Sequence, residues 1–241
     1  MKKMLLFAAL LIALSASVAS AAGVNVSWGN VCWKDGGVSS LTWACNNNSF
    51  TGVRMTCSFQ VPQDKTNFVG IGIYMEAITN APSTLVPDWW KLGAGECRPA
   101  SLTMSMDASV LGGACADPVA SLGGGGVGSY SEAAARASLN AAWAVADMVP
   151  LLAADENFAC QFRINAAKTV GTGLCAGCAT PLTWALNRIE VGYQGEAAQD
   201  VLDFVIPGGN QCLRWQNGAA PCSAPIPARN TTWGQVKSLY R

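Results

Sequence analysis

Residues 53–77, with the sequence VRMTCSFQVPQDKTNFVGIGIYMEA, contain two runs in which apolar and polar side chains alternate. The apolar positions of the two runs are Val53, Met55, Cys57, Phe59 and Val61, followed by Val69, Ile71, Ile73, Met75 and Ala77. A period of two residues puts these side chains on one face of a strand, whereas a helix would scatter them around its circumference. Because the short polar turn Pro62–Asn67 joins the runs, they predict a hairpin of two antiparallel strands, with Arg54 and Gln60 on its exposed face.

The N-terminus has the three parts of a secretory signal peptide. Lys2 and Lys3 precede the apolar run Met4–Leu14, and small residues ending in Ala19-Ser20-Ala21 follow it. The apolar run is shorter than the roughly 20 residues that a membrane-spanning helix needs. We therefore expect residues 1–21 to be removed on export, and we expect no membrane span in the mature chain.

Removal of the signal peptide leaves 13 basic and 15 acidic residues, a net charge near −2. Such a chain has no basic surface to attract phosphate groups, so nucleic acid is not an expected partner. The chain also has no His. This absence excludes nucleophiles activated by His and most zinc sites, and we expect no cofactor or metal. Carboxylates, thiols, Lys and Tyr remain as possible catalytic groups.

All ten Cys lie in the mature part of the chain, which predicts up to five disulfides in an exported protein. Spacing does not determine connectivity. The expected pairs are Cys32–Cys45, Cys57–Cys160, Cys97–Cys115, Cys175–Cys178 and Cys212–Cys222. The pair Cys57–Cys160 is chosen because both residues occupy apolar positions of alternating strands.

Further alternating or apolar segments predict short strands along residues 24–28, 41–45, 102–106, 158–164, 182–191 and 201–206. One helix is expected near residues 130–149, because Ser129 and Glu132 form a capping box before a helical stripe at Leu139, Trp143, Ala146 and Val149. The glycines at 123–126 are interpreted as a flexible surface loop. Residues 22–220 are therefore predicted to form a mainly β domain, an antiparallel β-sandwich of jelly-roll or immunoglobulin-like type with one inserted or crossover helix.

Three features suggest an activity, each with a structural alternative. Cys175 and Cys178 form a CxxC motif, which is found in thiol-disulfide oxidoreductases, but the surrounding sequence favours a structural disulfide. Asp155-Glu156 is the only adjacent acidic pair, and a glycoside hydrolase requires two carboxylates in proximity. Trp89, Trp90 and Trp215 are candidate platforms for carbohydrate, although Trp side chains are more often buried.

The C-terminal end differs from the rest of the chain. Residues 221–229 contain three prolines and predict a stiff spacer. Residues 230–241 then predict a short amphipathic tail whose recognition residues are Trp233, Val236, Lys237, Leu239 and Tyr240. This tail either docks on its own domain or is recognised by export or surface-attachment machinery.

The loop Pro87-Asp88-Trp89-Trp90 leading to Cys97-Arg98, the CxxC at Cys175 and the C-terminal sequence Thr232-Trp233-Gly234-Gln235-Val236-Lys237-Ser238-Leu239-Tyr240-Arg241 resemble a group of uncharacterised exported bacterial proteins. The resemblance covers most of the mature chain and implies export, without an assigned activity. Together with the residues, it predicts a secreted or cell-surface structural or binding protein, whose partner is a carbohydrate or an envelope component. A carbohydrate-binding module, a carboxylate-based glycoside hydrolase and a thiol-disulfide oxidoreductase are the alternatives.

Overall fold

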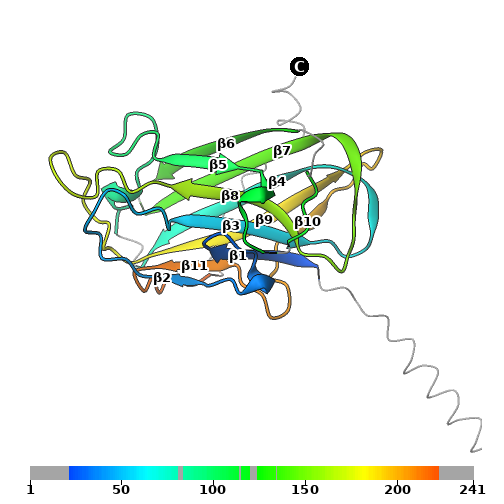
Figure 1. Cartoon of the computed structure of the whole chain (residues 1–241), viewed down its shortest axis with the longest axis horizontal. Coiled ribbons are helices and arrows are strands. Elements are labelled where there is room, and N and C mark those ends of the chain that lie inside the picture. Colours follow the sequence, from blue (N-terminus) through cyan, green and yellow to red (C-terminus); the bar gives the residue numbers. More distant parts are fainter. Residues whose placement is uncertain (1–21, 81–83, 114, 120–123, 134, 223–241) are drawn as a thin grey trace, which may run out of the picture.

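Two β-sheets face each other across a single hydrophobic core in the computed structural model, which describes residues 22–80, 84–113, 115–119, 124–133 and 135–222 (Figure 1). The four-stranded sheet has the order β1-β3-β8-β5, formed by β1 (Gly23–Trp28), β3 (Arg54–Gln60), β8 (Asn157–Ile164) and β5 (Leu102–Ser105). The seven-stranded sheet has the order β2-β11-β9-β4-β7-β6, and β10 (Asp200–Leu202) also pairs with β9. Its other strands are β2 (Ser40–Leu41), β11 (Cys212–Trp215), β9 (Leu182–Tyr193), β4 (Lys65–Thr79), β7 (Arg136–Leu151) and β6 (Gly124–Ala133).

All strand pairs are antiparallel except β2 with β11. The helices of the described residues are single 3-10 turns, namely η1 (Trp33–Asp35), η2 (Asp88–Trp90) and η3 (Ala108–Val110). The mainly β sandwich expected from the sequence is confirmed. None of these helices is long enough and apolar enough to cross a membrane.

The two alternating runs in residues 53–77 form β3 and β4, but they do not form a hairpin. β3 pairs with β1 and β8, whereas β4 pairs with β7 and β9 in the opposite sheet. Their apolar faces therefore meet across the core: the Phe59 and Phe68 ring centroids lie 6.4 Å apart, and Cys57 Sγ lies 3.4 Å from Met75 Sδ. The predicted hairpin is wrong because alternation identifies a buried face and leaves open whether its neighbour lies beside it or opposite it.

The predicted helix near 130–149 is also wrong, because β6 and β7 occupy that region. They pair without interruption from Gly124 with Val145 to Ala133 with Arg136. The residues buried along β7 alternate: Ala137, Leu139, Ala141, Trp143 and Val145. The alanine-rich segment satisfies a helical stripe and a period of two equally well, and pairing with β4 and β6 decides between them. Gly124–Gly126, expected in a loop, begins β6.

The outer face of β3 is not exposed, contrary to the prediction for Gln60. Thr56, Ser58 and Gln60 are all buried, because residues 29–35 and the segment before β8 cover them. Arg54, at the end of the strand, is half-buried. The four-stranded sheet is therefore covered on both faces, and the polar residues of its outer face form internal hydrogen bonds rather than contacts with water.

The described residues contain four disulfides, three of which join segments far apart in the sequence. Cys32 pairs with Cys115, Cys45 with Cys178, Cys97 with Cys175 and Cys212 with Cys222. Only Cys212–Cys222 matches the expected pairing. The expected pairs Cys32–Cys45, Cys97–Cys115 and Cys175–Cys178 are wrong because the fold brings loops from different strands together, with separations of 83, 133 and 78 residues in the observed bridges.

Two further observations on cysteine follow from these pairs. Cys175 and Cys178 each form a disulfide with a different loop, so the two cysteines of the CxxC are not bonded to each other. Cys57 and Cys160 are register partners on β3 and β8, but both are free and buried, so the expected bridge between them is not formed. The four bridges are consistent with an oxidising, extracellular environment.

The expected signal peptide at 1–21 and the expected tail at 230–241 lie outside the described residues, as does the spacer from residue 223 onward.

Candidate functional site

The three tryptophans expected to bind carbohydrate are inside the molecule. Trp89, Trp90 and Trp215 each have an exposed fraction of 0%. Trp89 stacks on Trp215 with ring centroids 5.3 Å apart, and Trp90 contacts Trp215 edge to face at 5.4 Å. Trp43 and Trp184 extend this cluster. Because sugar rings stack only on exposed ring faces, these residues are not a carbohydrate platform, and the sequence expectation is corrected.

Arg98 covers this tryptophan cluster and is itself only 1% exposed. Its guanidinium carbon lies 3.8 Å from the centroid of Trp89. Its nitrogen atoms donate to the carbonyl oxygens of Trp89, Ala167 and Asn165. Burial lowers the pKa of Arg98 to about 10. No described carboxylate forms an ion pair with it, so carbonyl oxygens and an aromatic face stabilise the charge. This arrangement fastens two loops together and is structural.

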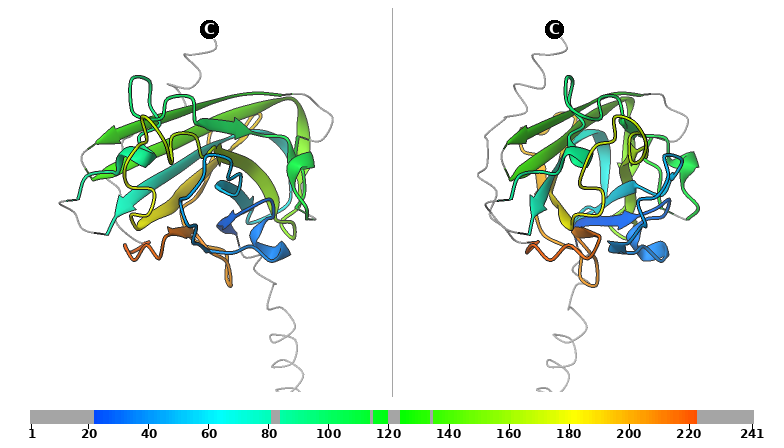
Figure 2. Two further views of the ribbon diagram at one scale, coloured as in Figure 1. Left: turned by 60° about the vertical axis from the view of Figure 1, so that its left-hand side comes forward. Right: turned by 90° about the vertical axis from the view of Figure 1, so that its left-hand side faces the viewer.

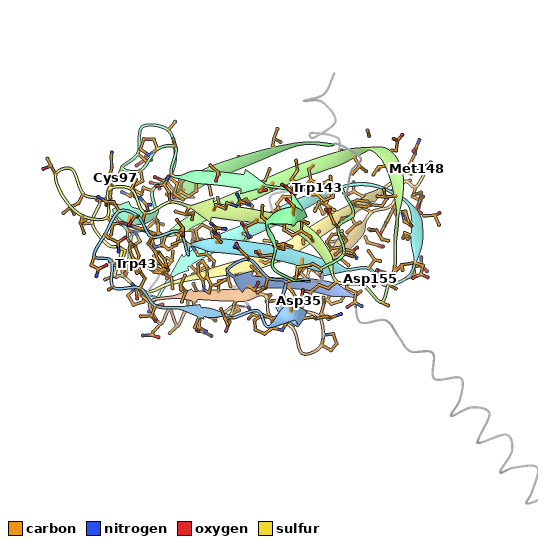
Figure 3. All side chains as sticks on the ribbon, in the orientation of Figure 1. Asp35, Trp43, Cys97, Trp143, Met148 and Asp155 are labelled. Carbon is orange, nitrogen blue, oxygen red and sulfur yellow. A yellow bond between two sulfur atoms is a disulfide. The ribbon has the colours of Figure 1, made fainter. Side chains whose placement is uncertain are left out.

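A cleft of about 250 Å³ lies beside the covered face of the four-stranded sheet. Its lining consists of Lys34, Asp35, Cys115, Ala116, Ala154, Asp155 and Glu156. Figure 3 shows Asp35 and Asp155 at the same side of the molecule, near β1. Three carboxylates and one ammonium group thus line one small cavity. We regard this acidic cleft as the candidate functional site, because it brings polar groups from three distant segments to one place.

Glu156 is one of the residues that line the acidic cleft and is 7% exposed. Its Oε1 accepts hydrogen bonds from Asn25 Nδ2 at 2.8 Å and Ser58 Oγ at 2.6 Å. Its Oε2 accepts one from the Lys34 backbone N–H at 2.9 Å. Hydrogen bonds to a charged acceptor are stronger than neutral ones, so these three donors fix the carboxylate in one position.

The wall of the acidic cleft is held by covalent and backbone contacts. The Cys32–Cys115 disulfide ties the segment before η1 to the opposite wall. The Ala116 N–H donates to the Glu156 carbonyl, and the Phe158 N–H donates to the Ala116 carbonyl. Gly36 ends η1 at φ 89°, a left-handed conformation that glycine adopts without steric cost. These contacts hold the walls of the cleft in a fixed arrangement.

The chemistry open to the acidic cleft is limited. Its carboxylates accept hydrogen bonds from hydroxyl or ammonium groups, and Lys34 Nζ already donates to Gln60 Oε1 at 3.0 Å. No group of three or more potential metal ligands is found among the described residues. Ser58 donates to Glu156 in the manner of a nucleophile and its base, but Ser58 is completely buried and cannot reach a substrate.

Asp155-Glu156 is recognisable in the sequence as an adjacent acidic pair, but no local pattern connects it with Lys34 and Asp35. No spacing signal links these segments, which are brought together by β1, β3 and β8. No family model and no curated protein matched this chain.

Proposed function

We propose that this protein is an exported structural or binding protein, and that the acidic cleft binds a small ligand rich in hydroxyl groups, such as one sugar unit of an envelope carbohydrate. The observation that carries the proposal is that Glu156, which lines the cleft, is held by three hydrogen bonds, and that the Cys32–Cys115 disulfide joins the walls of the cleft. A site that is already ordered loses little conformational entropy when a ligand binds.

The size and polarity of the acidic cleft support a small ligand. Its volume of about 250 Å³ lies below the roughly 300–1,000 Å³ of pockets that enclose drug-sized molecules. Carboxylate oxygens are acceptors for sugar hydroxyls, and the lining contains no aromatic side chain that would favour stacking. The cleft thus suits one polar unit held by hydrogen bonds.

Export is supported by the signal-peptide pattern of residues 1–21, by the four disulfides and by the resemblance to exported bacterial proteins. A rigid, cross-linked sandwich stays folded outside the cell and resists proteolysis there. These features suit a component of the cell surface or of the surrounding medium.

Calorimetric titration of the mature, oxidised protein with a panel of neutral and acidic monosaccharides tests the proposed ligand. We expect heat of binding with at least one sugar, and we expect the Asp155→Asn variant to weaken it at least tenfold. Asp203→Asn, an exposed carboxylate outside the cleft, is the matched control and should bind as the wild type does. Binding that is equal in Asp155→Asn and wild type would show that the cleft is not the site.

A carboxylate-based glycoside hydrolase is the second candidate, because Asp35, Asp155 and Glu156 line the same cleft. Such an enzyme needs two carboxyl groups within about 5–9.5 Å on either side of the bond that is cleaved. Incubation with aryl glycosides separates the candidates. Release of the aryl group by the wild type, abolished in Asp155→Asn, would favour the hydrolase, whereas binding without turnover favours the binding protein.

A further inference from the structure

β6 is the long edge strand of the seven-stranded sheet. Among the described residues it pairs with β7 on one side and with no strand on its other side. β6 lies at the margin of the sandwich, outside β7 (Figure 2). Within the described part of the chain, its backbone hydrogen bonds run to β7 alone, over ten residues without a register shift. The other side of β6 therefore presents a row of N–H and C=O groups to the surroundings.

The other edges of the two sheets are protected. β1 has its outer backbone covered, since Val24 N–H donates to Phe204 O, Val26 N–H to Asn210 O and Trp28 N–H to Val38 O. β2, β5 and β10 contain two, four and three residues. Short strands and covered strands are the usual means of preventing edge-to-edge association. β6 has neither protection.

The sequence of β6 also lacks the residues that normally block an edge. Residues 124–133 read GGGVGSYSEA, with no Lys, Arg or Pro, and Glu132 is the only charged residue. Val127 is 50% exposed. Gly126 has the least space, because a Cβ there would overlap Met106 Sδ and lie 2.8 Å from Trp143 Cβ, whereas a Cβ on Gly125 would meet nothing within 4 Å. Small side chains leave the edge open to close approach by another backbone.

We propose that two copies of this protein associate through β6, in antiparallel pairing about a two-fold axis at Gly128, so that the seven-stranded sheets of both copies become one sheet. Pairing of a strand with its own copy is self-complementary and closed, as a two-fold interface requires. In this register Glu132 of each copy faces Gly124 of the other, so the two carboxylates are separated by the length of the strand and do not repel each other. Tyr130 of one copy lies opposite Gly126 of the other, and an aromatic side chain across from a glycine stabilises edge pairing.

A second copy is a better occupant than an unrelated peptide on two grounds. The strand is nearly uncharged, so it does not select a basic or acidic partner. Its alternation is weak, with Val127 as the only large apolar residue on the outer face, so it has no series of pockets for the side chains of a specific peptide. Main-chain hydrogen bonds in a symmetric pairing need neither feature.

Sedimentation velocity of the mature protein from about 1 to 100 µM tests the proposal, since this range covers moderate affinities. We expect a concentration-dependent dimer. In Ser129→Lys the two lysines become diagonal neighbours across the axis, and their repulsion should weaken the dimer at least tenfold at low salt and less at high salt. Ala144→Lys is the matched control, because Ala144 is exposed on the same outer face but belongs to β7, one strand away from the edge. It should dimerise like the wild type.

Hydrogen exchange supplies the second measurement. We expect amides of residues 124–133 to become protected at the higher protein concentration in the wild type and not in Ser129→Lys. A monomer at all concentrations would overturn the proposal, and protection of β6 in that monomer would show that another part of the same chain covers the edge. A dimer lost in Ala144→Lys and kept in Ser129→Lys would also overturn it, since association would then use the face of the sheet.

Discussion

Replacement of Arg98 by Met should destabilise the protein more than any other single change of a charged residue among those described. The Met side chain keeps the apolar stem but leaves the carbonyl oxygens of Trp89, Ala167 and Asn165 without their donor. A buried acceptor without a partner costs about 1–3 kcal/mol, and the lost contact with Trp89 adds up to about 2 kcal/mol. The substitution also removes the desolvation cost of burying the charged guanidinium group, and this gain offsets part of the lost stability.

The expected decrease in the free energy of unfolding is therefore about 3–5 kcal/mol for Arg98→Met. Arg98→Lys should lose about 2–3 kcal/mol, because an ammonium group cannot donate to three separated carbonyls while it stacks on a ring. The assay is equilibrium unfolding in guanidinium chloride with the disulfides intact, followed by tryptophan fluorescence.

Lys91→Met is the matched control. Lys91 forms an ion pair with Asp88 at 2.8 Å, and the two side chains are 26% and 51% exposed, so its loss should cost no more than about 1 kcal/mol. If Arg98→Met costs as little as this control, the hydrogen bonds from Arg98 to the three carbonyl oxygens do not stabilise the loops around the tryptophan cluster.

Three other predictions concern cysteine, tyrosine and the tail. Cys57 and Cys160 should resist alkylation in the native protein, because burial and the neighbouring Cys57 raise the pKa of the Cys160 thiol. Denaturation without reductant should then expose two thiols by mass spectrometry, and none would mean a fifth bridge. Burial, with Glu132 for Tyr130 and Asp200 for Tyr193, raises the pKa of both phenols. The native state keeps these protons where the unfolded state loses them, so stability should fall as the pH rises above about 10. This loss should be smaller in the Tyr130→Phe/Tyr193→Phe variant when unfolding is measured from pH 8 to 11. Deletion of residues 230–241 should leave the melting temperature unchanged and mislocalise the protein if the tail is an address. A lower melting temperature with unchanged location would indicate docking, and no change in either would exclude both roles.

The sequence by itself determined which segments are strands wherever alternation was unambiguous. β3, β8 and β4 from Ile71 onward follow their pattern of apolar residues, because the period of side chains along a strand is a local property of the backbone. At the start of β4 a register shift buries Phe68 in place of the expected Val69. Local pattern failed in residues 136–151, where abundant Ala fits both periods. There the cross-strand partners on β4 and β6 select the strand.

Only the tertiary structure decided how the strands are assembled. A buried face on β3 is satisfied by any apolar neighbour, so the sequence could not tell a hairpin from two strands in facing sheets. For the same reason ten Cys predict an oxidising compartment but not which loops meet.

For the candidate site, too, the sequence determined one part and the tertiary structure the other. The acidic pair Asp155-Glu156 is visible in the sequence. Its hydrogen-bond donors Asn25, Ser58 and the Lys34 N–H come from segments 98 to 131 residues away in the chain. Tryptophan is suited both to an exposed carbohydrate platform and to a hydrophobic core. Trp89 and Trp215 belong to the core, because both are completely buried. Contacts between distant segments depend on how the whole chain packs, and no local pattern encodes them.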